Sequence, residues 1–407
     1  MHDFSALAVQ LNEYPVGTLT RLPGDRIVFQ FHDAYLADHQ RPTLSYSFYD
    51  ALHALIPSTK TTQTRAPAFF SNLLPEGHLR EYLAKQANIK PIKEFDLLAL
   101  LGDDLPGAIR LVPMEMPPYL VDSKESLRKI DEPEANILKF SLAGVQLKFS
   151  VLLEPSGGLT IPAHGEGGDW VVKLPSMRFQ NVPENEFSML MLAKAINIEI
   201  PEISLIDMKE ISSLPKFAST MQGKALITKR YDRTEGTRIH SEDLAQVYGV
   251  YPHKKYDGVS YSNITNMLLK NLSETVANEF VKRLVFNILI GNGDMHLKNW
   301  SFIYPDTRSA VLAPAYDYVA THLYMENESL ALSFGKEKKF ANLNRETVKH
   351  FAKKSEMSEK QVLAITDETI DATVSAWKIL KDGFPLTKSV LDAQEKQMMT
   401  MAKQLSE

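Results

Sequence analysis

Short stretches of alternating apolar and polar residues dominate the beginning of the chain, and this alternation predicts β-strands. The first two stretches flank the turn Pro23-Gly24-Asp25, so we expect them to form a hairpin. Apolar residues at helical spacing follow, and the pattern as a whole predicts a small α+β unit over residues 1–115. The expected strands are 16–22, 26–31 and 43–48, and the expected helices are one opened by Pro75-Glu76 and one over 95–101.

A segment rich in proline and acidic residues follows, which we interpret as a linker over residues 116–136. Beyond it strands come first, and helices dominate from residue 241 onward. One of these helices carries Phe280, Leu284 and Ile288 at four-residue spacing and ends near Gly291. Strands followed by helices, with a polar loop where they meet, predict an α+β architecture of two lobes around a cleft, 137–240 and 241–407. The expected strands are 148–153, 159–161, 170–174 and 225–228, with a helix over 184–196.

The composition excludes several kinds of chemistry. The 407 residues include no cysteine, so disulfides, zinc ribbons, iron–sulfur clusters and thiol nucleophiles are excluded. A net charge of −5 offers no general attraction to nucleic acid or to anionic lipid. The first residues lack the basic and apolar parts of a signal peptide, and no apolar run approaches the ~20 residues of a membrane helix. We therefore expect a soluble cytoplasmic protein.

The densest polar cluster of the sequence, residues 293–299, directly follows the apolar helix. Asp294 and Asn299 lie five positions apart, the D-x-x-x-x-N spacing of phosphotransferase catalytic loops. A second hairpin then leads to Asp317, where such enzymes place a metal-binding carboxylate. An Asp or an Asn in a turn caps a helix far more often than it binds metal. The three residues in this order nevertheless favour a phosphotransferase in which Asp294 is the catalytic base and Asn299 and Asp317 bind Mg²⁺.

The other lobe should supply a lysine for the nucleotide phosphates and a glutamate to hold it. Lys173 ends an apolar strand and Glu186 follows 13 residues later on a helix, although a strand-end lysine beside a helix start is an equally good interpretation. The phosphate loop is ambiguous, because residues 141–148 contain one glycine and residues 165–168 contain three. His296 either polarises the loop or braces it.

Several long motifs in a fixed order resemble the HipA-type serine/threonine protein kinases, the toxins of bacterial HipA–HipB toxin–antitoxin pairs. The resemblance covers nearly the whole chain and is carried by residues 69–77, 100–108, 141–148, 172–175, 185–186, 239–244, 291–299 and 313–317.

This resemblance implies a protein-kinase-like fold with a β-rich N-lobe and a helical C-lobe, ATP and Mg²⁺ as cofactors, and an autophosphorylation site at Ser141. A phosphate there would compete with the phosphates of the nucleotide. It also implies a HipB-like antitoxin, operator DNA bound through that antitoxin, and a substrate in the translation machinery such as an aminoacyl-tRNA synthetase. The residues expected at the nucleotide are Ala143, Gly144, Val145, Gln146, Leu147, Lys148, Lys173, Glu186, the adenine-reading hinge Lys229-Arg230-Tyr231, His296 and Tyr316.

Two alternatives remain open from the sequence. The loop pattern D-x-H-x-x-N also resembles that of lipid kinases, so the acceptor could be a lipid or a small molecule, although the acidic balance argues against a lipid surface. In a different class, the chain could act chiefly as a co-repressor that joins an antitoxin on DNA. DNA binding by this chain alone would contradict a division of labour in which the partner supplies most of the affinity.

Overall fold

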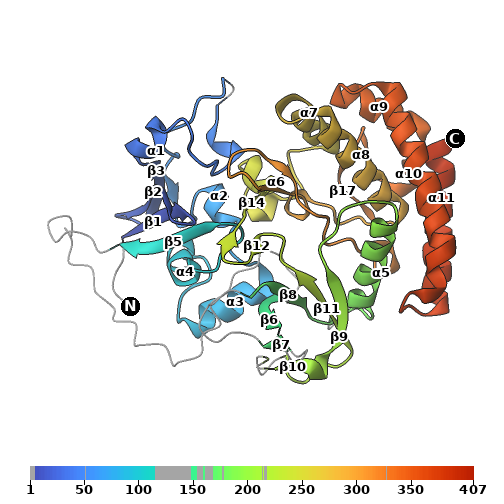
Figure 1. The fold of residues 1–407 in the computed structure, drawn as a ribbon, viewed down its shortest axis with the longest axis horizontal. Helices are drawn as coiled ribbons and strands as arrows, with labels where there is room; N and C mark the ends of the chain where they lie inside the picture. The colour runs from blue at the N-terminus through green and yellow to red at the C-terminus, as the bar shows by residue number, and fades with distance from the viewer. Residues whose placement is uncertain are drawn as a thin grey trace.

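The computed structural model describes residues 5–50, 52–114, 148–153, 159–160, 168–176, 178–212, 214, 218–326 and 328–407. Three regions follow one another along the chain (Figure 1). We call them the N-terminal unit (residues 5–114), the strand lobe (148–239) and the helical lobe (240–407). In Figure 1 the N-terminal unit lies on the left and the long helices of the helical lobe lie on the right.

The N-terminal unit is built on a five-stranded antiparallel sheet in the order β4-β3-β2-β1-β5. The predicted hairpin is confirmed as β2 and β3, and Ile27, Phe29 and Phe31 are buried on one face as expected. The elements are β1 (Ala6–Leu11), β2 (Tyr14–Leu22), β3 (Arg26–Phe31), α1 (Asp33–Ala37), β4 (Thr62–Gln63), α2 (Ala68–Ser71), α3 (Gly77–Gln86), α4 (Glu94–Leu101) and β5 (Ile109–Met114).

The strand expected over residues 43–48 is wrong. Tyr46–Phe48 forms a 3₁₀ turn instead, capped by the Ser45 side chain, which accepts a hydrogen bond from the Ser47 amide. The segment crosses to the helical lobe, where the Thr43 amide donates to the Thr307 carbonyl over 2.8 Å. A segment that passes between two regions buries some of its side chains and exposes others. Its apolar residues therefore alternate with polar ones, as they do in a strand.

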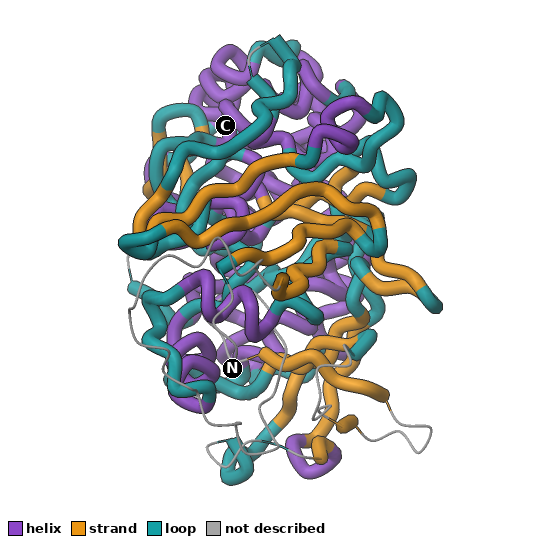
Figure 2. The backbone as a smooth tube through the Cα atoms, turned by 90° about the vertical axis from the view of Figure 1, so that its left-hand side faces the viewer, coloured by secondary structure: helices purple, strands orange, loops and turns teal. Residues whose placement is uncertain are grey.

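The strand lobe contains a six-stranded sheet in the order β10-β7-β6-β8-β11-β9, with helix α5 packed against β9 and β11. The four strands expected here are confirmed, and β9 and β10 were not foreseen. In Figure 2 the N-terminal unit faces the viewer, and its long strands cross the middle of the view above the strands of the six-stranded sheet. The elements are β6 (Lys148–Leu153), β7 (Leu159–Thr160), β8 (Trp170–Lys173), α5 (Val182–Ala195), β9 (Ile203–Asp207), β10 (Ile211–Ser212), β11 (Lys224–Lys229), β12 (Arg233–Thr234) and β13 (Thr237–Arg238).

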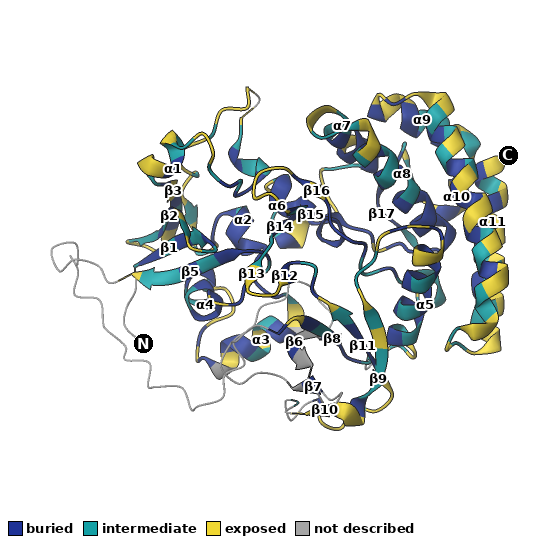
Figure 3. Cartoon of the chain, in the orientation of Figure 1, coloured by how far each residue is buried: buried dark blue, intermediate teal, exposed yellow. Residues whose placement is uncertain are grey.

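The helical lobe surrounds α8, the predicted apolar helix. Its stripe of Phe280, Leu284 and Ile288 is fully buried, and α7, α10 and α11 pack against it. Helix α11 forms the edge of the lobe and exposes its outer side (Figure 3). The elements are β14 (His240–Asp243), α6 (Leu244–Val247), α7 (Tyr261–Asn271), α8 (Glu274–Leu289), β15 (Ser301–Tyr304), β16 (Val311–Leu312), β17 (Ser329–Phe334), β18 (Glu337–Lys339), α9 (Arg345–Ser355), α10 (Glu359–Leu380) and α11 (Lys388–Ser406).

One buried apolar cluster is shared by the N-terminal unit and the strand lobe. It joins Phe29 and Phe70 of the N-terminal unit to Val151, Val172 and Ile227 of the six-stranded sheet. A second cluster fills the helical lobe around α8. Because the N-terminal unit and the strand lobe share the first cluster, apolar burial as well as polar contacts hold these two regions together.

Candidate active site

Lys173 at the end of β8 connects the strand lobe to the helical lobe. Its ammonium group donates hydrogen bonds to Glu186 on α5 and to Asp317, which follows the β15–β16 hairpin. The lysine and Glu186 are buried, whereas the Asp317 side chain keeps 22% of its surface exposed. The structure therefore brings together three residues that the sequence singled out separately.

The charge state of this group follows from its environment. Burial alone would lower the pKa of Lys173, but the charges of Asp317 and Glu186 outweigh burial and raise that pKa above its usual value. The lysine is therefore a permanent cation whose position is fixed by two carboxylates.

Asp294 lies on the loop that follows α8. The chain turns at Gly291, which has a φ of +69° and no room for a Cβ atom, since one built there would lie 2.5 Å from the His322 ring. The amide of Gly293 donates to the Thr321 hydroxyl over 2.7 Å. The Asp294 amide donates to the Asn292 side-chain oxygen over 3.1 Å. These bonds fix the backbone that leads into Asp294.

The Asp294 side chain is open to solvent and accepts a hydrogen bond of 2.7 Å from the Tyr256 hydroxyl. The surrounding protein still displaces enough water to raise the pKa of this carboxyl. This partial loss of water raises the pKa by more than the bond from Tyr256 and the charge of Lys255 lower it. A raised pKa makes the carboxylate a better proton acceptor. The sequence did not predict a role for Tyr256, because this residue lies 38 positions before Asp294 in a polar segment without a motif.

The donor atoms of Asn299 and Asp317 suit a hard divalent cation. The Asn299 amide nitrogen donates to the Asp294 carbonyl over 2.8 Å, which leaves its amide oxygen free of hydrogen bonds within the described residues. Asp317 has a φ of +56°, a left-handed conformation that is uncommon for a residue other than glycine and clusters at functional sites. No group of three or more His, Asp or Glu residues in the described part of the chain could hold a metal ion. One amide and one carboxylate oxygen fit Mg²⁺, which takes few protein ligands and completes its shell with phosphates and water.

His296 is buried beneath the loop. Its ring lies edge-on to Tyr256 with the ring centroids 5.1 Å apart. Burial, together with the positive charge of Lys255, lowers the pKa of this histidine to about 3. A neutral ring in contact with Tyr256 favours the interpretation that His296 braces the loop, one of the two that the sequence left open.

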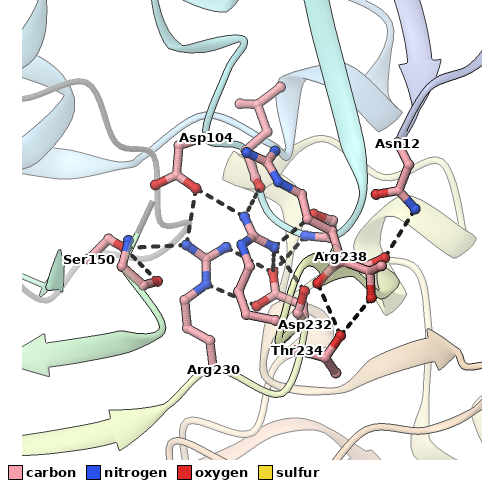
Figure 4. Close-up of polar contacts among 12 residues, drawn as sticks. Asn12, Asp104, Ser150, Arg230, Asp232, Thr234 and Arg238 are labelled. Atoms are coloured by element: carbon pink, nitrogen blue, oxygen red, sulfur yellow. Dashed lines mark hydrogen bonds and ion pairs between the residues drawn. The ribbon is translucent and has the colours of Figure 1, made fainter. Parts of the chain in front are cut away.

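The three residues of the expected adenine hinge point in different directions. Lys229 is exposed, with its ammonium 4.0 Å from Glu202. Arg230 is buried in an ion-pair cluster, 3.2 Å from Asp104 of the N-terminal unit and 2.9 Å from Asp232 (Figure 4). The Arg230 side chain is thus committed to this cluster, and only the backbone of Arg230 remains for the expected contact with adenine.

Tyr231 is the hinge residue whose side chain faces the site. Its ring stacks on Tyr316 with the centroids 5.8 Å apart. The Tyr316 hydroxyl donates to the carbonyl of Lys298, one residue before Asn299. This aromatic pair therefore links the hinge to the loop of Asp294.

Part of the expected site lies outside the described residues. Ser141 and the residues of the expected nucleotide loop, Ala143 to Leu147, belong to this part, and for Lys148 only the backbone is described. Lys148 pairs with Lys173 in the register of β6 and β8, so the first described residue of β6 lies beside the lysine.

Two family models match the chain. The model described as HipA N-terminal domain matches residues 7–112, and the one described as HipA-like C-terminal domain matches residues 140–377. The Sinorhizobium fredii protein Y4dM, which is named as a kinase, is 46% identical to this chain over 395 residues, which are 96% of each of the two proteins. The serine/threonine-protein kinase toxin HipA of Shewanella oneidensis is 25% identical over 301 residues, 66% of either chain.

A solved structure extends the comparison to the fold. A chain of the Shewanella oneidensis complex of HipA, HipB and operator DNA matches with a TM-score of 0.75 at 20% identity, covering 98% of this chain and 96% of that one. The prediction of a two-lobed, kinase-like α+β fold with a small N-terminal unit is thereby confirmed. In the described part of the chain, no helix has the length and apolar character needed to span a bilayer.

Proposed function

Because this chain belongs to the HipA family, we propose that it is an ATP- and Mg²⁺-dependent serine/threonine protein kinase. The observation that carries the proposal is the contact of Lys173 with both Glu186 and Asp317 beside the loop of Asp294. A lysine held by a helix glutamate, a loop Asp and Asn, and a second Asp after a hairpin are the parts that phosphoryl transfer requires.

Each residue then has a defined task. Lys173 clamps the nucleotide phosphates, and Glu186 holds it in place. Asp294, oriented by Tyr256, accepts the proton of the acceptor hydroxyl as the oxygen attacks the terminal phosphorus. Asn299 and Asp317 would hold Mg²⁺, which neutralises charge on the phosphates when it is bound. Tyr231 and Tyr316 flank the adenine end of the cleft.

The biological role that we propose is that of a toxin. The chain would phosphorylate a protein of the translation machinery. In the cytoplasm it would bind a HipB-like antitoxin, and through that antitoxin it would bind operator DNA. The Shewanella oneidensis relative is named a serine/threonine-protein kinase toxin, and a chain of the same fold occurs with HipB and operator DNA. The net charge of −5 supports DNA binding through the partner rather than by this chain alone. A chiefly co-repressor role is the second candidate.

Phosphorylation of Ser141 would switch the enzyme off. About two negative charges beside the nucleotide loop would compete with the nucleotide phosphates for the same cradle. Ser141→Ala should therefore lose self-labelling from γ-labelled ATP and keep ATP binding. Label retained by this variant would place the modification elsewhere.

Phosphoproteomics after brief induction of the wild type and of Asp294→Asn tests the function in cells. We expect a small set of serine or threonine sites in translation proteins that are modified by the wild type only. Identical phosphoproteomes, with growth repressed equally by both forms, would contradict the kinase proposal and favour the binding module.

A further inference from the structure

The N-terminal unit reaches the loop of Asp294 through the segment Asn72 to Glu76. The carboxylate of Glu76 lies 3.1 Å from the ammonium of Lys255 and 3.8 Å from that of Lys298. Both lysines belong to the helical lobe and are 6% exposed. A carboxylate from one region thus neutralises two buried cations of another.

Asn72 adds a second set of bonds. Its carbonyl and its side-chain oxygen each accept a hydrogen bond of 3.0 Å from Lys298, and its amide group donates to the Val250 carbonyl over 2.8 Å. Lys298 also donates to Asp243 over 2.9 Å. With three acceptors and a nearby carboxylate, the ammonium of Lys298 is committed to structure and is not free to reach a substrate.

Both lysines adjoin the catalytic groups along the chain. Lys255 precedes Tyr256, whose hydroxyl donates to Asp294. The Lys255 carbonyl accepts a hydrogen bond of 3.2 Å from the Leu297 amide. Lys298 precedes Asn299, whose side chain donates to the Asp294 carbonyl. If either lysine moved, the residue that follows it, Tyr256 or Asn299, would move too. Each of these residues is hydrogen-bonded to Asp294, so Asp294 would be displaced as well.

We propose that Glu76, supported by Asn72, is a positioning residue of the active site, so that the N-terminal unit is a working part of the kinase. The inference rests on the proposed function and adds a residue to that site. Glu76 touches no reacting atom in this account and acts through Lys255 and Lys298. Without its charge, two buried ammonium groups lose a partner and move toward water, and the loop moves with them.

Glu76→Gln in the full-length chain tests the proposal, because the amide preserves shape and removes charge. ATP turnover is measured as ADP release while ATP is varied. We expect kcat to fall about 10- to 100-fold with KM for ATP changed less than about 2-fold, because misplaced catalytic groups slow the chemical step and leave nucleotide contacts intact. Glu76→Asp, which keeps the charge, should recover part of the rate.

A matched control is Asp96→Asn. Asp96 belongs to the same unit and is 2.6 Å from Arg21, away from the loop. Its removal should leave kcat unchanged. In addition, Glu76→Gln combined with Lys255→Gln should lose less rate than the product of the two single losses, since Lys255→Gln already removes one of the two cations that Glu76 serves.

Hydrogen exchange provides a readout that does not need catalysis. In Glu76→Gln the amides of residues 292–299 should exchange at least about 10-fold faster, while those in the middle of α8 stay unchanged. Unchanged exchange in the loop, or a loss of kcat equal in Asp96→Asn, would overturn the proposal. If wild-type protein turned over no ATP and the loop of the variant still lost protection, the kinase function would fail and the positioning role of Glu76 would stand.

Discussion

The ammonium group of Lys173 donates a hydrogen bond to the carboxylate of Asp317, 144 positions later in the chain. The bond joins the strand lobe to the helical lobe at the point where nucleotide phosphates and a metal ion would meet. The two residues thus mark a contact between the two lobes that the order of strands and helices predicts.

Replacing Lys173 should abolish phosphoryl transfer. Lys173→Met removes the phosphate clamp and leaves Glu186 as a buried carboxylate without its cation, so ATP turnover should fall at least about 100-fold. Lys224→Met is the control, because Lys224 is half exposed and 4.0 Å from Asp207 in the same sheet. A Lys173→Met variant with more than about a tenth of wild-type turnover would remove the lysine from the mechanism.

Asn299→Ala should weaken the response to Mg²⁺. Loss of one oxygen ligand should raise the Mg²⁺ concentration for half-maximal turnover by about 10-fold, and saturating Mg²⁺ should restore part of the rate. Titration of Mg²⁺ at fixed ATP measures this shift. The same titration with Asn342→Ala, an exposed asparagine bonded to Glu337, should give the wild-type curve. An unshifted midpoint in Asn299→Ala would exclude Asn299 as a metal ligand.

The cluster in Figure 4 should stabilise the junction between the N-terminal unit and the strand lobe. Asp104 is fully buried and accepts hydrogen bonds from Arg230 and Arg233, so Asp104→Ala should lower the free energy of unfolding by about 3–5 kcal/mol. The neighbouring Asp103 keeps 63% of its side chain exposed and lies 3.7 Å from Arg110. Asp103→Ala should change stability by less than about 0.5 kcal/mol. Equal effects of the two substitutions in urea denaturation would show that the buried cluster contributes no more than a surface pair.

Acid should weaken the junction between the N-terminal unit and the helical lobe through His240. Burial lowers the pKa of this histidine to about 4, while its ring bonds the Leu44 carbonyl at 2.7 Å. The unfolded chain binds a proton near pH 6.5 and the folded chain only near pH 4, so the stability that neutral His240 contributes is lost as pH falls through this window. Glu242 nearby has the opposite effect, because burial raises its pKa to about 7.

A comparison of variants separates the two groups. Between pH 7 and pH 4 the free energy of unfolding of wild type should fall relative to His240→Gln by up to about 3 kcal/mol, and Glu242 cancels because both proteins contain it. Parallel pH curves for the two proteins would show that His240 does not titrate between the folded and unfolded states.

The sequence predicted best what is encoded locally. Lys173 ends a recognisable apolar strand, and Asp294 and Asn299 share one loop, so their spacing alone carried information. The ion pair between Glu76 and Lys255 joins residues 179 positions apart. It depends on how the N-terminal unit packs against the helical lobe, and no local sequence pattern encodes that packing. The prediction of a strand at 43–48 failed for the same reason, since a segment that crosses between regions acquires the burial pattern of a strand.

The hinge shows the limit of a motif. Residues 229–231 follow one another at the end of β11, yet the Arg230 side chain is held by Asp104, a residue 126 positions earlier. The motif specified a backbone position, and tertiary contacts decided where the side chain went.

Transfer of label from γ-³²P-ATP to protein, followed by phosphoamino acid analysis, tests the central claim most directly. Purified wild-type chain with Mg²⁺ should place label on serine or threonine, and Asp294→Asn should reduce that transfer at least about 100-fold while ATP still binds. Equal label transfer by the two proteins, or label recovered only in a lipid or small molecule, would contradict the account.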